Sequence, residues 1–398
     1  MKRSSLVLVA LAWTGLAAAQ TASPDATPPA WTQQFGGYFK NLASGSRSYF
    51  NEQPWGDNLD RLRITYDAKD GDWLAIHLDY DNELHFGNLT GLPDFEAVRD
   101  RQGAAWLDLQ HIFVDRAHAY WDTSLYRGFV SLHSPSLTFT LGRQRIGWGT
   151  AHFFSPMDMF NPISPLQVES DERQGVDAAL LEFRSPGALR WSAVYAPQDG
   201  FRRSTSALRL SRTIRNYDFD VGAARFGEDW TAGADFAGQL GGAGVRGEVT
   251  YRWRHPLPGV VPVATRNALR FTLGSDYAFS DGLYLVAEYF YNQGQPNLTA
   301  SQPLDPAVLL RFSNEIFTLH RHFFSAGASY PLTPLWKLET YVVADLAGPS
   351  AVVLPRLSHS LTANADLAAG AQLFVSSKSG EFHGLSDLVY LEFMVHFR

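Results

Sequence analysis

The sequence predicts an all-β fold, a transmembrane antiparallel β-barrel of about 18 strands, within a range of 16–18. First, segments of about 9–13 residues alternate apolar and polar side chains along most of the chain, which is the two-residue period of a strand. Second, the polar positions of these segments carry full charges, as a water-filled barrel interior allows. Third, the chain ends in such a segment, in which the apolar residues Val389, Leu391, Phe393, Val395 and Phe397 alternate with Tyr390, Glu392, Met394 and His396.

The N-terminus has the features of a secretory signal. Met1-Lys2-Arg3 is basic, an apolar stretch follows from Leu6 to Leu16, and Ala17-Ala18-Ala19 is a small-residue cleavage site. The apolar stretch is too short to span a bilayer. We therefore expect a signal peptide over residues 1–19, a flexible lead-in over 20–34, and one barrel domain over 35–398.

The alternation predicts which side chains face lipid and which face the lumen. Leu62 and Ile64 fall on one face of their segment, and Arg61 and Arg63 on the other. The same pattern recurs in Val245–Arg254 and in several later segments. The predicted pore-lining residues are Arg61, Arg63, His77, Asp79, Arg246, Glu248, Arg252, Arg254, Arg270 and Glu288. Among them, the arginines from 246 to 270 suggest a local wall that attracts anions.

Connections of two lengths separate the predicted strands. Tight turns at 69–72, 134–136, 280–282 and 331–334 contrast with long loops at about 84–111, 145–174, 294–314 and 376–385. Outer-membrane barrels show this difference between their periplasmic and extracellular ends. A short helix is expected within residues 94–110.

Composition excludes several classes of protein. The formal charge is −7 and no long basic run occurs, so a nucleic-acid partner has no electrostatic support. The absence of cysteine excludes disulfide scaffolds, thiolate zinc sites and iron–sulfur clusters.

A soluble sandwich, β-helix or propeller is the alternative architecture for an exported all-β chain.

Residues 145–174 form the most unusual connection. The segment is too long for a turn and too apolar for a solvated loop, with three prolines and aromatic residues such as Phe153 and Phe154. We predict that it folds into the barrel and narrows the pore; the alternative is an external loop. The residues assigned to this constriction are Arg143, Arg145, Trp148, Asp171, Glu172 and Arg173.

Arg143 and Arg145 continue an apolar, outward face. The strand must therefore leave the membrane there, or a bulge at Gly142 must turn the arginines inward.

Residues that could carry other chemistry have simpler explanations. His320-Arg321-His322 has metal-ligand spacing, but no third ligand lies near in sequence, so rim or lumen histidines are expected. Asp171-Glu172 is expected to be ion-paired rather than catalytic. We expect no catalytic site, no metal site and no cofactor.

Two motifs resemble known proteins. The stretch 141–149, with 160–165 and 171–177, resembles a signature of porin-like barrels of the Gram-negative outer membrane, distantly similar to the alginate-export family. The terminal strand resembles the assembly signal of such barrels, although Arg398 follows the usual final aromatic residue, here Phe397.

The resemblance implies an outer-membrane porin-like channel for passive diffusion of small hydrophilic solutes, with anionic solutes as a candidate class. The expected partners are outer-membrane lipid and lipopolysaccharide, the solutes, and the barrel-assembly machinery through the C-terminal strand. The alternatives are a conduit or exporter for an acidic polysaccharide, and a barrel enzyme or structural envelope protein.

Overall fold

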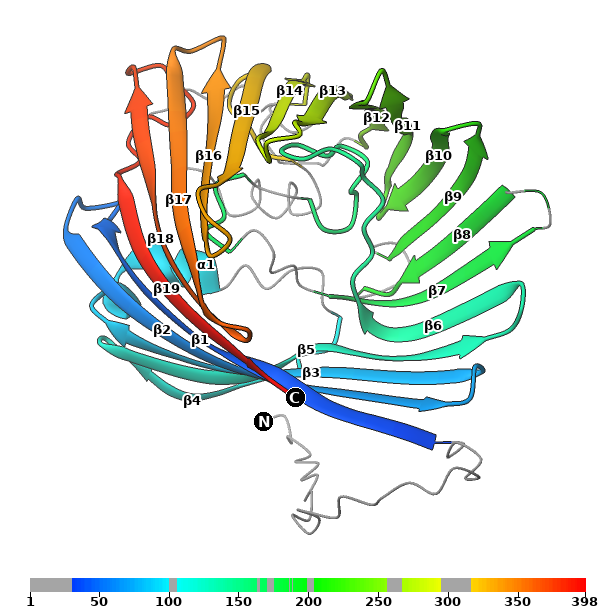
Figure 1. Ribbon diagram of the computed structural model, residues 1–398, viewed down its shortest axis with the longest axis horizontal. Coiled ribbons are helices and arrows are strands. Elements are labelled where there is room, and N and C mark those ends of the chain that lie inside the picture. The colour runs from blue at the N-terminus through cyan, green and yellow to red at the C-terminus, as the bar shows by residue number, and fades with distance from the viewer. Residues whose placement is uncertain are drawn as a thin grey trace.

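The structure is a computed structural model that describes residues 31–99, 106–162, 165–169, 175–185, 187, 189–198, 204–255, 267–294 and 316–398. Nineteen strands are described, and eighteen of them close an antiparallel barrel, as the sequence predicts (Figure 1). The predicted signal peptide lies outside the described residues.

The elements follow one another in the order of the chain. The strands are β1 (Trp31–Arg47), β2 (Pro54–Asp70), β3 (Leu74–Gly87), β4 (Gln110–Arg116), β5 (Ala119–His133), β6 (Leu137–Gln144), β7 (Val176–Arg184), β8 (Leu189–Ala196), β9 (Thr205–Ile214), β10 (Tyr217–Phe226), β11 (Asp229–Leu240), β12 (Ala243–Trp253), β13 (Ala268–Ala278), β14 (Tyr284–Asn292), β15 (His322–Pro331), β16 (Trp336–Asp345), β17 (Ser350–Thr362), β18 (Ala365–Ser376) and β19 (Leu388–Phe397). Two short helices, η1 (Leu89–Gly91) and α1 (Pro93–Arg99), lie between β3 and β4.

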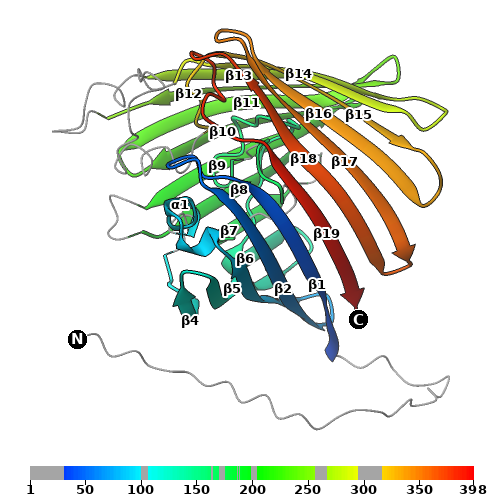
Figure 2. The same ribbon diagram turned by 90° about the vertical axis from the view of Figure 1, so that its left-hand side faces the viewer.

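Closure of the barrel depends on the last strand returning to the first. β19 pairs antiparallel with β1, with Gly37 opposite Phe397, and the two strands lie side by side in both ribbon views (Figure 2). β4 is not counted among the eighteen, because β3 pairs directly with β5, and β4 pairs only with the first residues of β5, beyond the part that pairs with β6. The expected short loop helix is present as α1.

The two faces of the wall follow the predicted alternation. On β2, the outward Leu62 and Ile64 are 37% and 43% exposed, whereas the inward Arg61 and Arg63 are each 7% exposed. Val249 and Leu285 are likewise exposed, and Glu248 and Glu288 are buried inside the barrel. A register one residue different would exchange every one of these positions.

The two ends of the barrel differ as the turn lengths predict. Tight connections such as 71–73, 241–242 and 332–335 lie at one end, here called the short-turn end. Segments 88–118, 145–175 and 377–387 connect strands at the other, here called the long-loop end. No helix of the described residues is long and apolar enough to cross a membrane.

One sequence-based expectation needs correction, and one of the two alternatives for Arg143 and Arg145 is excluded. β1 begins at Trp31, opposite Asp70 of β2, so the barrel starts before residue 35 and residues 31–34 are strand rather than lead-in. No bulge occurs at Gly142, since the register of β6 with β5 and with β7 is continuous there. Gly142 has φ +129°, and a Cβ there would lie 2.2 Å from the carbonyl oxygen of Gly128, so glycine is required for close strand approach.

Arg143 therefore stays on the outer face and is not part of the constriction. It tolerates that position because its Nε donates to Asp177 of β7 at 2.8 Å, and its other nitrogens donate to the carbonyl oxygens of Leu125 and Leu107. A paired arginine at the long-loop end of a strand costs far less than an isolated one at the bilayer midplane.

Candidate functional site

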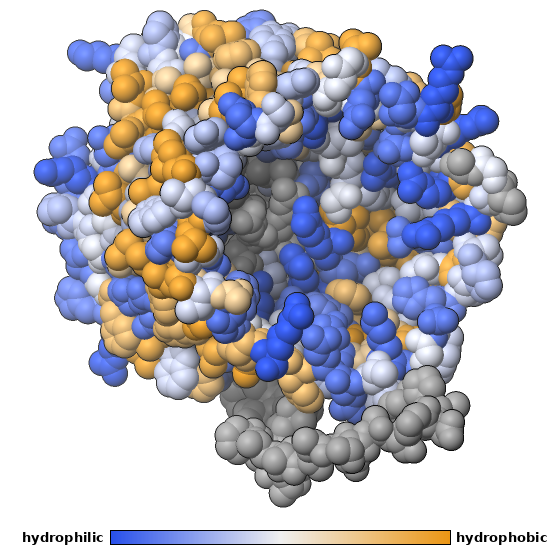
Figure 3. Space-filling model, viewed as in Figure 1, coloured by the Kyte–Doolittle hydropathy of each residue, from blue (hydrophilic) through white to orange (hydrophobic). Residues whose placement is uncertain are grey.

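The candidate site is the barrel interior, into which the connection between β6 and β7 folds. Figure 1 shows this segment inside the ring of strands, and Figure 3 shows hydrophilic side chains around the opening. We call the described residues 145–162 and 165–169 the inward segment. The inward segment lies inside the barrel because its aromatic and methionine side chains need apolar surroundings.

One part of the inward segment packs on the wall formed by β7 to β10. Trp148, Met157, Met159 and Phe160 are buried there against small inward side chains. These wall residues are Val176, Ala178, Val194, Ala196, Ala207 and Ala224. Small side chains on this wall leave the space that the large side chains of the segment fill.

A second part packs on the opposite wall, formed by β14 to β17. Phe154 stacks on Phe290, with ring centroids 4.6 Å apart, and also contacts Phe323. Phe153 joins the same apolar cluster, which includes Val343 and Val352. The inward segment thus bridges two walls of the barrel.

Glu248 of β12 holds the bend between these two parts. Its carboxylate accepts hydrogen bonds from the backbone N–H groups of Thr150, Ala151 and Met157, at 2.5, 2.6 and 2.9 Å. The Ser155 hydroxyl donates to the same carboxylate at 3.0 Å. A buried carboxylate that receives several backbone N–H groups fixes the path of the chain around it.

Glu288 of β14 makes a second cradle of the same kind. Its carboxylate accepts from the backbone N–H groups of His152 and Phe154, at 2.8 and 2.9 Å, and from that of Phe153 at 3.2 Å. The Thr272 hydroxyl donates to the carbonyl oxygen of Phe154 at 2.7 Å. Two wall carboxylates that sequence analysis assigned to the lumen therefore hold the inward segment.

A third anchor joins the end of the inward segment to β1 and β2. The Glu169 carboxylate accepts from both terminal nitrogens of Arg61, at 2.6 and 3.0 Å, and from Lys40 Nζ at 2.8 Å. Burial alone would raise the pKa of Glu169, but Arg61 and Lys40 outweigh it and lower the pKa to about 2. The carboxylate is therefore ionised at neutral pH.

The other predicted residues on β2 and β3 form close pairs. Arg63 donates to both oxygens of Asp81 at 2.6 Å, and its guanidinium carbon lies 3.7 Å from the ring centroid of Tyr126. Tyr126 is the extra residue of a bulge in β5. His77 lies between Asp67 and Asp79, at 2.8 and 3.1 Å. The inner surface of these strands thus carries charges of both signs.

The arginines of the predicted anion-attracting wall each contact a different acidic or polar group. Arg246 pairs with Asp276 and donates to the carbonyl oxygen of Thr150 at 3.0 Å. Arg252 lies 3.3 Å from Asp229, and Arg270 Nε donates to Asn292 at 2.9 Å. The backbone N–H of Arg254, whose side chain is buried just beyond β12, donates to Asn267. Arg252 and Arg270 also line a cavity of about 20 Å³ beside the inward segment, which has room for about one water molecule.

A row of acidic side chains crosses β10 to β12. Asp220 lies directly opposite Asp235, and Asp235 directly opposite Glu248, all on the inner face. Arg209 donates to Asp220 at 2.6 Å, but within the described part of the chain no N–H group donates to either buried carboxylate oxygen of Asp235. This row faces the lumen from a wall different from that of Lys40 and Arg61.

The predicted constriction residues are only partly brought together. Trp148 is buried inside the barrel and Arg145 is exposed. Asp171, Glu172 and Arg173 lie outside the described residues. Sequence analysis missed Lys40 and Glu169: the alternation of Tyr38, Lys40 and Leu42 could have revealed Lys40, but no periodicity marks a single carboxylate in a loop.

Comparison with solved structures supports the barrel fold. No protein-family model and no curated protein matches the chain. Among solved structures, Acinetobacter baumannii OccAB2 is similar with a TM-score of 0.60 and 10% identity, over 92% of this chain and 98% of that chain. Pseudomonas aeruginosa OccK3 (OpdO) matches with a TM-score of 0.57 and 8% identity, over 92% and 95%, and P. aeruginosa OccK9 (OpdG) with 0.57 and 12%, over 92% and 98%.

At these identities the likeness shows the fold, which is the 18-strand barrel of the Occ outer-membrane porins. A likeness to the alginate-export family is not shown.

Proposed function

We propose that the protein is a channel of the bacterial outer membrane, through which small hydrophilic solutes diffuse passively. The observation that carries the proposal is a closed barrel with a charged inner surface, narrowed by a segment that is fixed to the wall at Glu248, Glu288 and Glu169. Size selection would come from the segment, and selection by charge from the groups that remain beside the passage.

The basic side chains of Lys40, Arg61 and Arg63 face the lumen from β1 and β2, where Glu169 at the end of the inward segment binds the first two. Each of these side chains is less than 10% exposed, and carboxylates neutralise most of the charge, as Glu169 does for Arg61 and Asp81 for Arg63. We therefore propose a weak preference for anions rather than a binding site for one anion.

The alternative of an acidic-polysaccharide conduit needs basic side chains along the whole passage. The inner walls of β7 to β10 and β14 to β17 instead carry apolar side chains that the inward segment covers. The proposal of a channel rather than an enzyme is supported by the use of both wall glutamates as backbone acceptors, which leaves neither Glu248 nor Glu288 placed to act on a solute.

The test is single-channel recording of the purified, refolded protein in planar bilayers, with reversal potentials measured in a salt gradient. Discrete conductance steps, with a reversal potential shifted modestly toward that of the anion, would support the proposal. A protein that assembles as a barrel but gives no conductance steps would refute the channel, and a cation-side reversal potential would refute the anion preference.

A further inference from the structure

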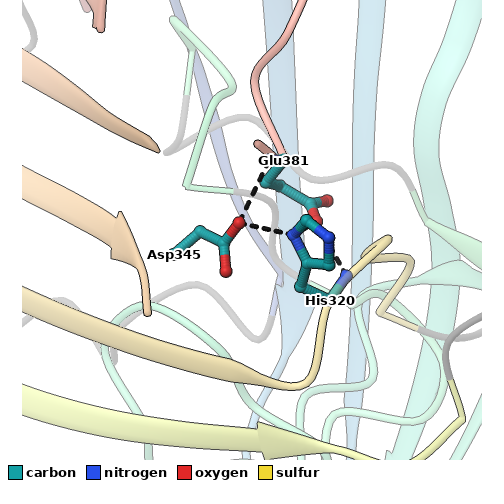
Figure 4. Close-up of side chains that lie close together, drawn as sticks. All are labelled: His320, Asp345 and Glu381. Atoms are coloured by element: carbon teal, nitrogen blue, oxygen red, sulfur yellow. Dashed lines mark hydrogen bonds and ion pairs between the residues drawn. The ribbon is translucent and has the colours of Figure 1, made fainter. Parts of the chain in front are cut away.

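Three potential metal ligands meet at the long-loop end, from segments far apart in the sequence. His320 lies just before β15, Asp345 ends β16, and Glu381 lies in the loop between β18 and β19 (Figure 4). None of them takes part in holding the inward segment. His322, the neighbour that sequence spacing suggested as a second ligand, instead contacts the Tyr289 hydroxyl at 2.7 Å.

The donor atoms of the three residues lie close to the geometry of a metal site. His320 Nδ1 is 2.5 Å from Asp345 Oδ2 and 3.9 Å from Glu381 Oε2, and all three donor atoms lie within 4.8 Å of one another. Bonds of 2.0–2.1 Å to a tetrahedral zinc ion place ligand atoms about 3.3 Å apart. The observed separations lie on both sides of this value, so shifts of about 1 Å would bring all three donors to one ion.

The two carboxylates are also held in place by backbone groups. Asp345, whose side chain has no exposed surface, accepts from the N–H groups of Ala347 and Gly348 through Oδ1. Glu381 accepts from the N–H groups of Leu319 and His320. Such hydrogen bonds orient ligands in metal sites. Oδ2 of Asp345, the oxygen nearest to His320, accepts one backbone hydrogen bond, from the N–H of Glu381 at 3.1 Å, which ties the two carboxylate ligands together.

The charge of the cluster favours a cation. Within the described part of the chain, neither Asp345 nor Glu381 has a lysine or arginine partner. Two neighbouring buried carboxylates are costly unless a positive charge lies between them. A bound dication would supply that positive charge.

We propose that His320, Asp345 and Glu381 bind a transition-metal dication of the zinc class, with water completing the coordination. The mixture of one imidazole nitrogen and two carboxylate oxygens favours zinc over calcium or magnesium, which prefer all-oxygen sites. The site would join the residues before β15 to the β18–β19 loop at the rim of the barrel. It is independent of the proposed channel function.

The test is zinc binding to the full-length, folded protein after chelation and desalting, followed by calorimetry and by thermal unfolding with and without Zn²⁺. We expect one high-affinity Zn²⁺ per chain, a thermal midpoint that rises with Zn²⁺ concentration, and no comparable effect of Mg²⁺. His320→Ala, Asp345→Asn and Glu381→Gln should each weaken Zn²⁺ binding by at least about tenfold.

His322→Ala and His383→Ala are the matched controls, because both remove a histidine from the same rim without touching the cluster. They should leave Zn²⁺ binding unchanged. Absence of stoichiometric binding to the wild-type protein would overturn the proposal and indicate that the cluster is only a hydrogen-bonded network. Equal loss of binding in the controls, or none in Glu381→Gln and His320→Ala, would also overturn it. Heat-modifiable migration on gels checks that each variant has assembled.

Discussion

The guanidinium of Arg61 donates two hydrogen bonds to the carboxylate of Glu169, at 2.6 and 3.0 Å, and so ties the end of the inward segment to strand β2. Lys40 donates to the same carboxylate from β1. Glu169 is thus the counter-charge of two basic side chains in the lumen. Its removal should change both the charge of the passage and the attachment of the segment.

Replacing Glu169 should make the channel more selective for anions. In Glu169→Gln, Arg61 and Lys40 keep their charges while one negative charge is lost, so the local potential becomes more positive. The reversal potential in a salt gradient should move toward that of the anion. Glu96→Gln, which makes the same change on the exposed surface of α1, should leave it unaltered. An unaltered reversal potential in Glu169→Gln would show that this carboxylate does not border the passage.

The contribution of Glu169 to stability should depend on pH in a defined direction. Its pKa in the folded protein is about 2, below the ordinary value of 4.5. A lowered pKa contributes stability that is fully present above the ordinary value and is lost as the pH falls through the folded value. The difference in thermal midpoint between wild type and Glu169→Gln should therefore be constant from pH 7 to about 5 and shrink between about 4.5 and about 2. A difference that already disappears between pH 7 and 5 would contradict this anchor.

The glutamate cradles should keep the inward segment resistant to proteases. In Glu248→Gln, the amide group cannot accept all the hydrogen bonds that two carboxylate oxygens receive. Each lost hydrogen bond to a charged group costs about 1.5–3 kcal/mol. Limited proteolysis should cut within residues 145–169 faster in this variant, and faster still when Glu288→Gln is added. Equal cleavage rates in these variants and in Glu96→Gln would exclude the cradles as the cause of the segment's order.

Asp235 should be a site where removing a charge stabilises the barrel. Its carboxyl group is buried between Asp220 and Glu248, and among the described residues no N–H group donates to it. Asp235→Asn removes an acidic group from between two others and gives the side chain an amide donor for Asp220, and should raise the free energy of unfolding by about 1–3 kcal/mol. Denaturant titration measures this change, with Asp72→Asn in an exposed turn as the control. A loss of stability would mean that the carboxylate holds an ion or water that the amide cannot.

The sequence predicted the barrel because lipid and lumen impose opposite requirements on successive residues. Leu62 and Arg63 could be assigned to faces from their neighbours alone, and Glu248 and Glu288 followed from the same rule. Their role as acceptors for the inward segment could not, since it depends on contacts between residues about 100 positions apart.

For Arg143, the alternation predicts the outer face of the barrel, but it does not predict which residue neutralises the charge there. Arg143 kept its outward position because Asp177, on the next strand, neutralises it. The same limit applies to His320: spacing suggested a pair with His322, whereas strand order brought Asp345 and Glu381 to it.

The most direct test of the account is the single-channel conductance after deletion of residues 150–168. The deletion removes Phe153, Phe154 and Met157, which fill space inside the barrel, and leaves the strands intact. Heat-modifiable migration of the deletion variant shows that the barrel has assembled. A conductance severalfold above that of the wild type is the predicted result. An assembled barrel with unchanged conductance would contradict the claim that this segment narrows the channel.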